Sequence, residues 1–193
     1  MSSERTYHHG DLRRAILTAA LDVIATDGPV ALSLRDLARR AGVSHAAPAH
    51  HFKDRTGLLT AIATEGYGLF ADALAAAPDL QERGVRYVRF ATEHPAHFQV
   101  MFQPDLYRTD APDLLAAKAR ATEALTEGIA GLPASGRGED PRLAGVAAWS
   151  LAHGFATLLL SGNLTGPTGE QHPEEVFRAL TELLFVPAST VDE

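Results

Sequence analysis

The sequence contains no cysteine, which excludes disulfide bonds and any thiolate nucleophile or metal ligand. Its uninterrupted apolar runs are short as well. The longest, around residues 158–160, is followed by Ser161 and Gly162, far below the about 20 residues that span a bilayer. Residues 1–5 lack the basic and then apolar pattern of a secretion signal. We therefore expect a cytoplasmic protein that has no membrane partner.

Alternating runs of β-branched residues, typical of strands, are scarce, whereas alanine and leucine recur at helical spacing along the 193 residues. The sequence therefore predicts an all-α fold of about nine helices. We expect an N-terminal domain at 1–56 and a helical C-terminal domain at 57–193. The helices are predicted at 11–27, 34–41, 45–51, 54–78, 80–94, 95–105, 112–131, 141–162 and 173–186.

Several helix starts are predicted from capping residues. Asp11 is expected to cap the first helix and Ser44 the third. Ser33, with Asp36 three residues later, predicts a capping box at the start of the second. Asp140-Pro141 marks a later start, because proline suits the first helical position.

Charge is distributed unevenly along the chain, whose formal net charge is -7. Residues 1–60 carry eight basic and six acidic side chains, a net +2, and the remainder carries nine and eighteen, a net -9. Because attraction to phosphates is screened over about 10 Å, a basic head on an acidic body indicates that nucleic acid would bind at the head only.

Residues 33–52 have the pattern of two short helices joined by a glycine turn. Ala38 is small enough for a close helix crossing, Gly42 occupies the turn and Val43 is expected to be buried beneath it. The exposed start of the second of these helices carries small and hydrogen-bonding side chains, which suit the major groove of DNA. The pattern indicates a three-helix DNA-binding domain of the helix-turn-helix type, with a plain helical hairpin as the alternative.

Basic side chains flank this predicted DNA-reading helix and could contact phosphates. The residues expected to bind DNA are Arg35, Arg39, Ser44, His45, Ala46, Ala49, His50, Lys53 and Arg55.

Three motifs in this region, LSLRDLARRAGVS at 32–44, HFKDR at 51–55 and the leucine pair at 58–59, resemble the tetracycline-repressor (TetR) family of bacterial regulators. The resemblance implies an operator-binding transcription regulator whose third helix reads DNA and whose fourth helix starts at a phosphate. Two positions depart from the family pattern. Ala49 stands where a phosphate-contacting tyrosine is usual, and Arg55 replaces the usual lysine while keeping its charge.

The C-terminal domain resembles the family's Trp-His-Gly class in AWSLAHG at 148–154 and in the companion segment EHPAHFQVMF at 93–102. Relatives of this kind dimerise through their last two helices. In the penultimate helix, alanines at 144, 148, 152 and 156 form a ridge of small residues that permits close helix packing. The predicted homodimer interface comprises Ala148, Leu151, Ala152, Phe155, Leu159, Phe177, Leu180 and Leu184, some of which could instead form the core.

Aromatic and methionine side chains of the same domain could line an apolar effector pocket, or could simply fill the core. They are Tyr87, Phe90, Phe98, Met101, Phe102, Trp149 and His153. We expect a ligand-responsive repressor with no metal, no cofactor and no catalytic residue. The alternatives are a metal-responsive regulator that uses His45, His50 and His51, and an enzyme that uses His153 as an acid or base, although the chain has no phosphate loop or nucleophile elbow.

Overall fold

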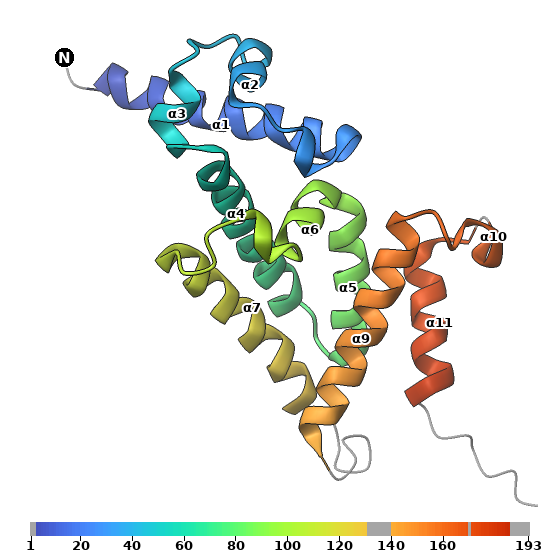
Figure 1. Cartoon of the computed structure of the whole chain (residues 1–193). Helices are drawn as coiled ribbons and strands as arrows, with labels where there is room; N and C mark the ends of the chain where they lie inside the picture. The colour runs from blue at the N-terminus through green and yellow to red at the C-terminus, as the bar shows by residue number, and fades with distance from the viewer. Residues whose placement is uncertain (1–2, 131–139, 170, 186–193) are drawn as a thin grey trace, which may run out of the picture. The chain divides into compact units, whose positions relative to one another are not determined.

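A computed structural model describes residues 3–130, 140–169 and 171–185, and within them all side chains except those of 3–11, 130, 141, 165, 168, 184 and 185. This part of the chain contains helices and no strand, as predicted (Figure 1). The elements are α1 (Ser3–Asp27), η1 (Pro29–Ala31), α2 (Leu34–Arg40), α3 (Ala47–Phe52), α4 (Arg55–Ala75), α5 (Leu80–Glu93), α6 (Pro95–Met101), η2 (Pro104–Leu106), α7 (Pro112–Ala130), α9 (Pro141–Leu160), α10 (Thr165–Thr168) and α11 (Pro173–Phe185).

The helix ends test the predicted caps. Asp140 caps α9 as expected, since its carboxylate accepts a hydrogen bond from the backbone NH of Arg142. The prediction for Asp11 is wrong, because α1 already begins at Ser3. Ser44 is not the cap of α3 either: that helix starts at Ala47, and Ala46 precedes it without a side-chain hydrogen bond.

Ser33 occupies the cap position of α2, but its side chain makes no capping hydrogen bond. The predicted capping box does not form, because the carboxylate of Asp36 instead accepts hydrogen bonds from Arg39 and Arg40. The helix still starts there, with the backbone NH of Leu37 donating to the carbonyl of Ser33 at 2.9 Å.

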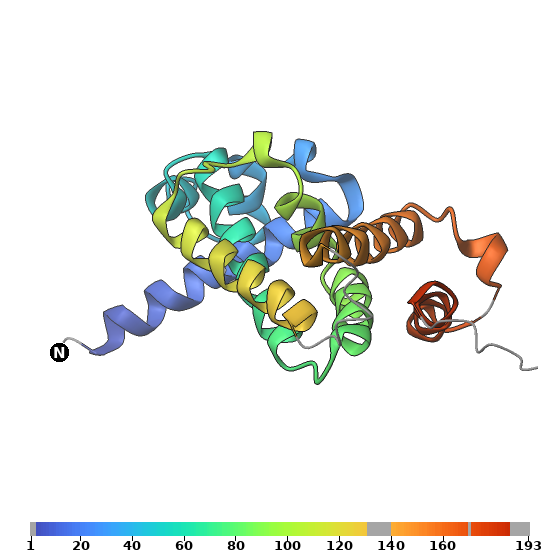
Figure 2. The ribbon, with the colours of Figure 1, turned by 90° about the horizontal axis from the view of Figure 1, so that it is seen from below.

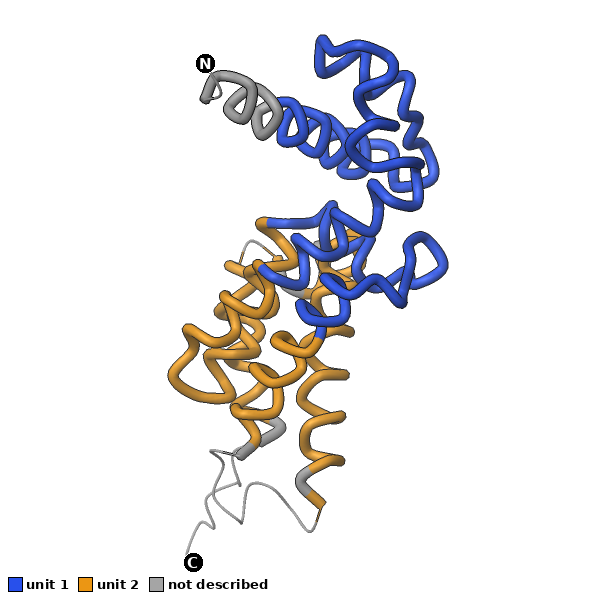
Figure 3. The backbone as a smooth tube through the Cα atoms, turned by 90° about the vertical axis from the view of Figure 1, so that its left-hand side faces the viewer, with its two compact units in different colours: residues 1–68, 94–118 blue, residues 69–93, 119–193 orange. Residues whose placement is uncertain are grey.

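The chain forms two compact units, each made of two separate stretches of sequence (Figure 3). Unit 1 comprises residues 1–68 and 94–118, and unit 2 comprises residues 69–93 and 119–193. The helices α4 and α7 each contribute residues to both units. These compact units do not show which residues are needed to bind DNA. The domain boundary expected between residues 56 and 57 therefore stays a prediction.

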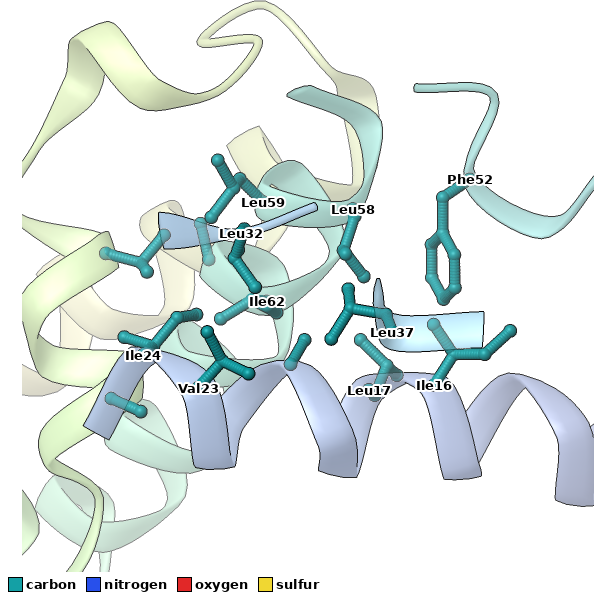
Figure 4. Close-up of a cluster of buried hydrophobic side chains, with 14 of the residues drawn as sticks. Ile16, Leu17, Val23, Ile24, Leu32, Leu37, Phe52, Leu58, Leu59 and Ile62 are labelled. Atoms are coloured by element: carbon teal, nitrogen blue, oxygen red, sulfur yellow. The ribbon is translucent and has the colours of Figure 1, made fainter. Parts of the chain in front are cut away.

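The core of unit 1 brings together buried side chains from α1, α2, α3 and α4 (Figure 4). Ile16 and Ile24 line one side of α1, and Leu37, Phe52 and Leu59 cover them from the following helices. Burying an aliphatic or aromatic side chain of this size contributes about 1.5–3 kcal/mol. The same cluster includes Ala96, Val100, Tyr107 and Leu114 from the second stretch of the unit.

In unit 2, α5 packs against α9 and α11, and α11 also contacts α9 (Figures 1 and 2). The ring of Phe177 on α11 lies 5.4 Å from that of Phe155 on α9. Gly84 on α5 admits this ring closely, since a Cβ at that position would lie 2.6 Å from Phe177 Cε1. The guanidinium of Arg89 on α5 forms a two-pronged ion pair with Glu174 on α11.

Helix α9 is strongly apolar, although most of its residues are not buried. Over Arg142–Leu160 it is long and apolar enough, by length and composition alone, to cross a membrane, and 17% of the most apolar stretch is buried. The sequence prediction missed this because it considered only uninterrupted apolar runs. Leu143, Val146 and Leu158 are exposed on the face of α9 that no described helix covers. An uncovered face of this kind on a regular helix indicates a surface that packs against something else.

Candidate functional site

The turn between α2 and α3 is held by the backbone. Gly42 has a φ of 66°, a left-handed conformation that glycine adopts without strain. The NH of Val43 then donates to the carbonyl of Ala38 at 2.9 Å, and the NH of Ala47 donates to the carbonyl of Ser44 at 3.0 Å. Because Ala38 and Ala47 are buried, the two helices cross closely and α3 keeps one fixed outer face.

That outer face carries the predicted DNA-reading side chains. Ser44, His45, Ala46, Ala49 and His50 are all exposed, whereas their neighbours Ala47 and Pro48 are buried. We call these five exposed residues the reading surface. Ser44, His45 and Ala46 lie in the turn before α3, and Ala49 and His50 lie on the helix itself, so the five side chains are exposed at and just before α3.

The basic side chains predicted to contact phosphates differ in their exposure and in their hydrogen-bond partners. Arg35 and Lys53 are exposed. Arg39 is exposed too, but it pairs with Asp36 at 2.5 Å, and the hydrogen bonds from Arg40 and Arg39 hold the pKa of that carboxyl below its usual value. Arg55 is half-buried and donates to the carbonyl of Pro29 at 2.6 Å, so its guanidinium ties the start of α4 to η1.

Lys53 owes its position to a tight turn that the sequence does not reveal. Its φ of 69° is left-handed, and the NH of Asp54 donates to the carbonyl of Phe52 at 2.9 Å across it. A γ-turn of this hand is rare and strained. The Asp54 carboxylate accepts from the NH of Gly57 at 2.7 Å, which caps α4 and lowers the pKa of Asp54. Arg108 also contacts this carboxylate, at 2.6 Å.

A second polar network of unit 1 joins α1, α4 and α6. Glu65 accepts two hydrogen bonds of 2.9 Å from Arg14, and its Oε1 lies 3.2 Å from Nε2 of His97. His97 is buried, and burial lowers its pKa although Glu65 acts in the opposite direction. The sequence places His97 only in a segment with a family resemblance, and gives no sign of this partner on α4.

Unit 2 contains a partly open cavity of about 280 Å³ between α5, α7, α9 and α11. Its walls are mainly apolar, and include Leu80, Leu125, Trp149 and Phe177. Of the residues predicted to form an effector pocket, Tyr87 and Trp149 line this cavity. Arg83, which also lines it, was missed because a sequence shows the charge of an arginine but not its burial.

The remaining residues of the predicted pocket lie elsewhere. Phe90 is buried against the ring of Phe70, at 5.0 Å between centroids. The rings of Phe98 and Phe102 contact each other within unit 1. Met101 lies in the same unit, where its backbone carbonyl accepts hydrogen bonds from the hydroxyls of Tyr67 and Tyr107. The structure therefore does not describe one pocket formed by the whole predicted set.

Tyr87 links the cavity to the Trp-His-Gly segment of α9. Its hydroxyl lies 2.9 Å from Nδ1 of His153, and the indole NH of Trp149 donates to it at 3.4 Å. Burial raises the pKa of Tyr87 and lowers that of His153, so both groups are held neutral. The contact between Tyr87 and His153 joins α5 to α9 beside the cavity.

The residues predicted to form the dimer interface differ in how deeply they are buried within the chain. Ala152, Phe155 and Phe177 are buried inside unit 2, and Ala148, Leu151, Leu159 and Leu180 are half-buried. The side chain of Leu184 lies outside the described residues. The alanine ridge of α9 thus faces the inside of its own unit, whereas Leu143, Val146 and Leu158 are exposed on the opposite face of the helix, and the interface itself stays a prediction.

Within the described residues, His45, His50 and His51 do not come together with one another or with acidic side chains as a group of three that could hold a metal ion.

Two family profiles match the chain. The profile described as bacterial regulatory proteins of the tetR family matches residues 16–62, and one described as a tetracyclin repressor-like C-terminal domain matches residues 80–184. No curated protein sequence matches.

Solved structures resemble the chain along most of its length. A protein of unknown function from Rhodococcus sp. RHA1 is 34% identical, with a TM-score of 0.71 over 92% of this chain and 95% of that one. PfmR, a TetR family transcriptional regulator from Thermus thermophilus, is 26% identical, with a TM-score of 0.63 over 88% and 96% of the two chains. AibR, solved in complex with isovaleryl coenzyme A and operator DNA, is 20% identical, with a TM-score of 0.67 over 92% and 100%.

Proposed function

Because this chain belongs to the TetR family of transcriptional regulators, we propose that it is a cytoplasmic repressor that binds a palindromic operator as a homodimer. A small molecule bound in the C-terminal domain would release it from DNA. The family membership makes the chain a DNA-binding regulator, and the sign of regulation, the operator symmetry and the dimer are the parts that we propose.

The reading surface is the observation that carries this proposal. Side chains that enter a major groove must be free of the protein core. Those of Ser44 and His45 are exposed in the turn before α3, and that of His50 is exposed on α3 itself, where Ala47 and Pro48 are buried. Arg35 and Lys53 lie on the flanking elements with their charges free to meet phosphates. Arg55, by contrast, is engaged with Pro29, so we assign it to positioning α4.

The dimer is proposed on the exposed face of α9. Leu143, Val146 and Leu158 share that face with Gly154, where an added Cβ would meet no atom within 4 Å. Apolar and small residues together allow a helix of a second subunit to approach closely. A twofold interface there would pair two reading surfaces, as a palindromic operator requires.

The effector is proposed to occupy the cavity of unit 2. Its volume of about 280 Å³ is close to the lower end of the range of about 300–1,000 Å³ for small-molecule sites. Support by analogy comes from AibR, whose structure contains isovaleryl coenzyme A as well as operator DNA.

Fluorescence anisotropy against DNA flanking the protein's own coding region tests the proposal. We expect this DNA to bind far more tightly than a random duplex of equal length at physiological salt. Arg35→Ala and His50→Ala should each weaken specific binding about tenfold, the equivalent of about 1.4 kcal/mol. Arg120→Ala removes the same charge from exposed α7 and serves as the matched control. Equal affinity for both DNAs would exclude the proposal.

A further inference from the structure

Among the described residues that line the unit 2 cavity, Arg83 on α5 is the one with a charged side chain. It is only 7% exposed, and its Nε and Nη1 are buried without a hydrogen-bond partner in the described part of the chain. Within the described residues it forms an ion pair with Glu127, whose Oε2 lies 4.0 Å from Nη1, too far for a hydrogen bond. Glu127 itself is mostly exposed to water.

The other polar groups in the cavity wall already have partners. The side-chain amide of Gln81 donates to Oγ of Thr181 at 3.0 Å, and the hydroxyl of Thr181 donates to the carbonyl of Arg178 at 2.7 Å. The Tyr87 hydroxyl is occupied by Trp149 and His153. Among these groups, Arg83 is therefore the one that a ligand could satisfy.

A buried guanidinium without hydrogen bonds is costly, since its desolvation is not repaid. The surroundings hold it in place: a Cβ on Gly128 of α7 would lie 3.0 Å from both Cδ and Nε of Arg83, so the glycine makes room for the arginine. A planar carboxylate matches the fork of donors that a guanidinium presents. One buried cation without a hydrogen-bond partner suits one negative charge, and the leucine and aromatic walls suit an apolar body.

We propose that the effector of this regulator is a monocarboxylate with an apolar body, whose carboxylate binds Arg83 while its hydrocarbon fills the space between Leu80, Leu125, Trp149 and Phe177. This inference rests on the proposed function for its regulatory meaning, but the binding site itself does not depend on DNA. Arg83 selects the charge of the ligand, and the apolar walls select its shape.

Trp149 provides a direct readout. It is the only tryptophan in the sequence, it lines the cavity and it is half-exposed. We would titrate the full-length protein with octanoate and 4-phenylbutanoate, and with the neutral amide of each acid, and follow the emission of Trp149. At least one acid should bind saturably and at least about tenfold more tightly than its amide, because only the acid has a charged carboxylate to accept hydrogen bonds from Arg83.

Two variants at Arg83 and one matched control identify the group responsible. Arg83→Met, close in length but neutral, should abolish the preference for acid over amide, and it should fold, because a buried charge without hydrogen bonds has been removed. Arg83→Lys should keep part of the preference. Arg86→Met is the control, since Arg86 lies on the same helix, pairs with Glu82 at 3.5 Å and is not part of the cavity wall.

Three results would overturn the inference: amides that bind as tightly as the acids, no saturable binding of either acid, or a preference that survives Arg83→Met. The anisotropy assay on the same protein separates this outcome from failure of the proposed function. Specific DNA binding without acid binding would reject the monocarboxylate alone, whereas acid binding without specific DNA binding would reject the regulator and retain the site.

Discussion

Gly57 at the start of α4 lies so close to Phe52 that a Cβ on the glycine would stand 2.0 Å from the carbonyl oxygen of Phe52. That same oxygen accepts the hydrogen bond from the NH of Asp54 across the left-handed residue Lys53. The first turn of α4 and the end of α3 are therefore in direct backbone contact. This contact fixes where Lys53 points relative to the reading surface.

Gly57→Ala should disrupt this contact. Backbone atoms cannot yield as a flexible side chain can, so the turn at Lys53 or the start of α4 must shift. We expect a loss of about 1–3 kcal/mol in the free energy of unfolding, measured by urea denaturation, and a loss of specific DNA binding by the folded protein.

Gly68→Ala in the same helix is the control, because a Cβ there meets nothing within 4 Å. It should stabilise the protein by about 0.5–1 kcal/mol, the usual gain when alanine replaces glycine inside a helix. If both variants had the same stability, the close approach at Gly57 would have no energetic consequence.

Trp149→Ala should have a modest effect on stability. The side chain is 46% exposed, so its loss should cost about 1–2 kcal/mol rather than the about 3–5 kcal/mol of a fully buried aromatic residue. Phe177→Ala, at a residue that is 1% exposed in the same unit, should show the larger loss. Thermal and urea unfolding followed by circular dichroism would compare them, and equal losses would contradict the placement of Trp149 at the edge of the core.

Val146→Glu should separate the subunits of the proposed dimer. The valine is 56% exposed on the uncovered face of α9, and a carboxylate there would be buried without a partner if a second subunit packed on it. Light scattering coupled to size-exclusion chromatography should report a monomer. Leu115→Glu, at a similarly exposed leucine on α7, should leave the dimer intact. A dimeric Val146→Glu protein would place the interface elsewhere.

Stability should fall as the pH is lowered from 7.5 to 5.5. In the unfolded chain His97 takes up a proton near its ordinary pKa of 6.5, whereas burial lowers its pKa in the folded chain. Protonation therefore favours the unfolded state below pH 6.5, and His153 acts in the same direction. Urea unfolding at pH 7.5, 6.5 and 5.5 measures the change. His97→Gln should reduce the pH dependence, and an increase in stability on acidification would contradict this assignment.

The sequence predicted several helices well because α5 and α11 have distinct apolar and polar faces and because other helices carry a clear start. Asp140-Pro141 and Pro173 marked helix starts that the structure reproduces. The start at Ser44 failed, because the backbone at 45 and 46 forms a turn before α3 begins at Ala47. A capping residue shows that a helix can start nearby, but tertiary packing decides at which residue it does so.

The periodicity of the sequence could not reveal whether an apolar helix face packs inside its own chain or against a second subunit. Ala152 and Ala156 have the spacing of a close helix contact, and they do make one, with the interior of their own unit. Similarly, the residue type of Arg55 indicates a donor but not the acceptor, which is the carbonyl of Pro29. The partner of a side chain depends on residues far away in the sequence, and Arg83 and Gly128 were missed for that reason.

Each unit is built from two separate stretches of sequence, and this limits which segments could be exchanged with a related protein by recombination. A recombination event near residue 56 would transfer the reading surface but leave behind Val100, Tyr107 and Leu114, which complete the core beneath it. The transferred segment would then have to accept another protein's side chains at those positions. A change of DNA specificity is therefore expected to arise by gradual substitution within unit 1 more readily than by exchange of residues 1–56.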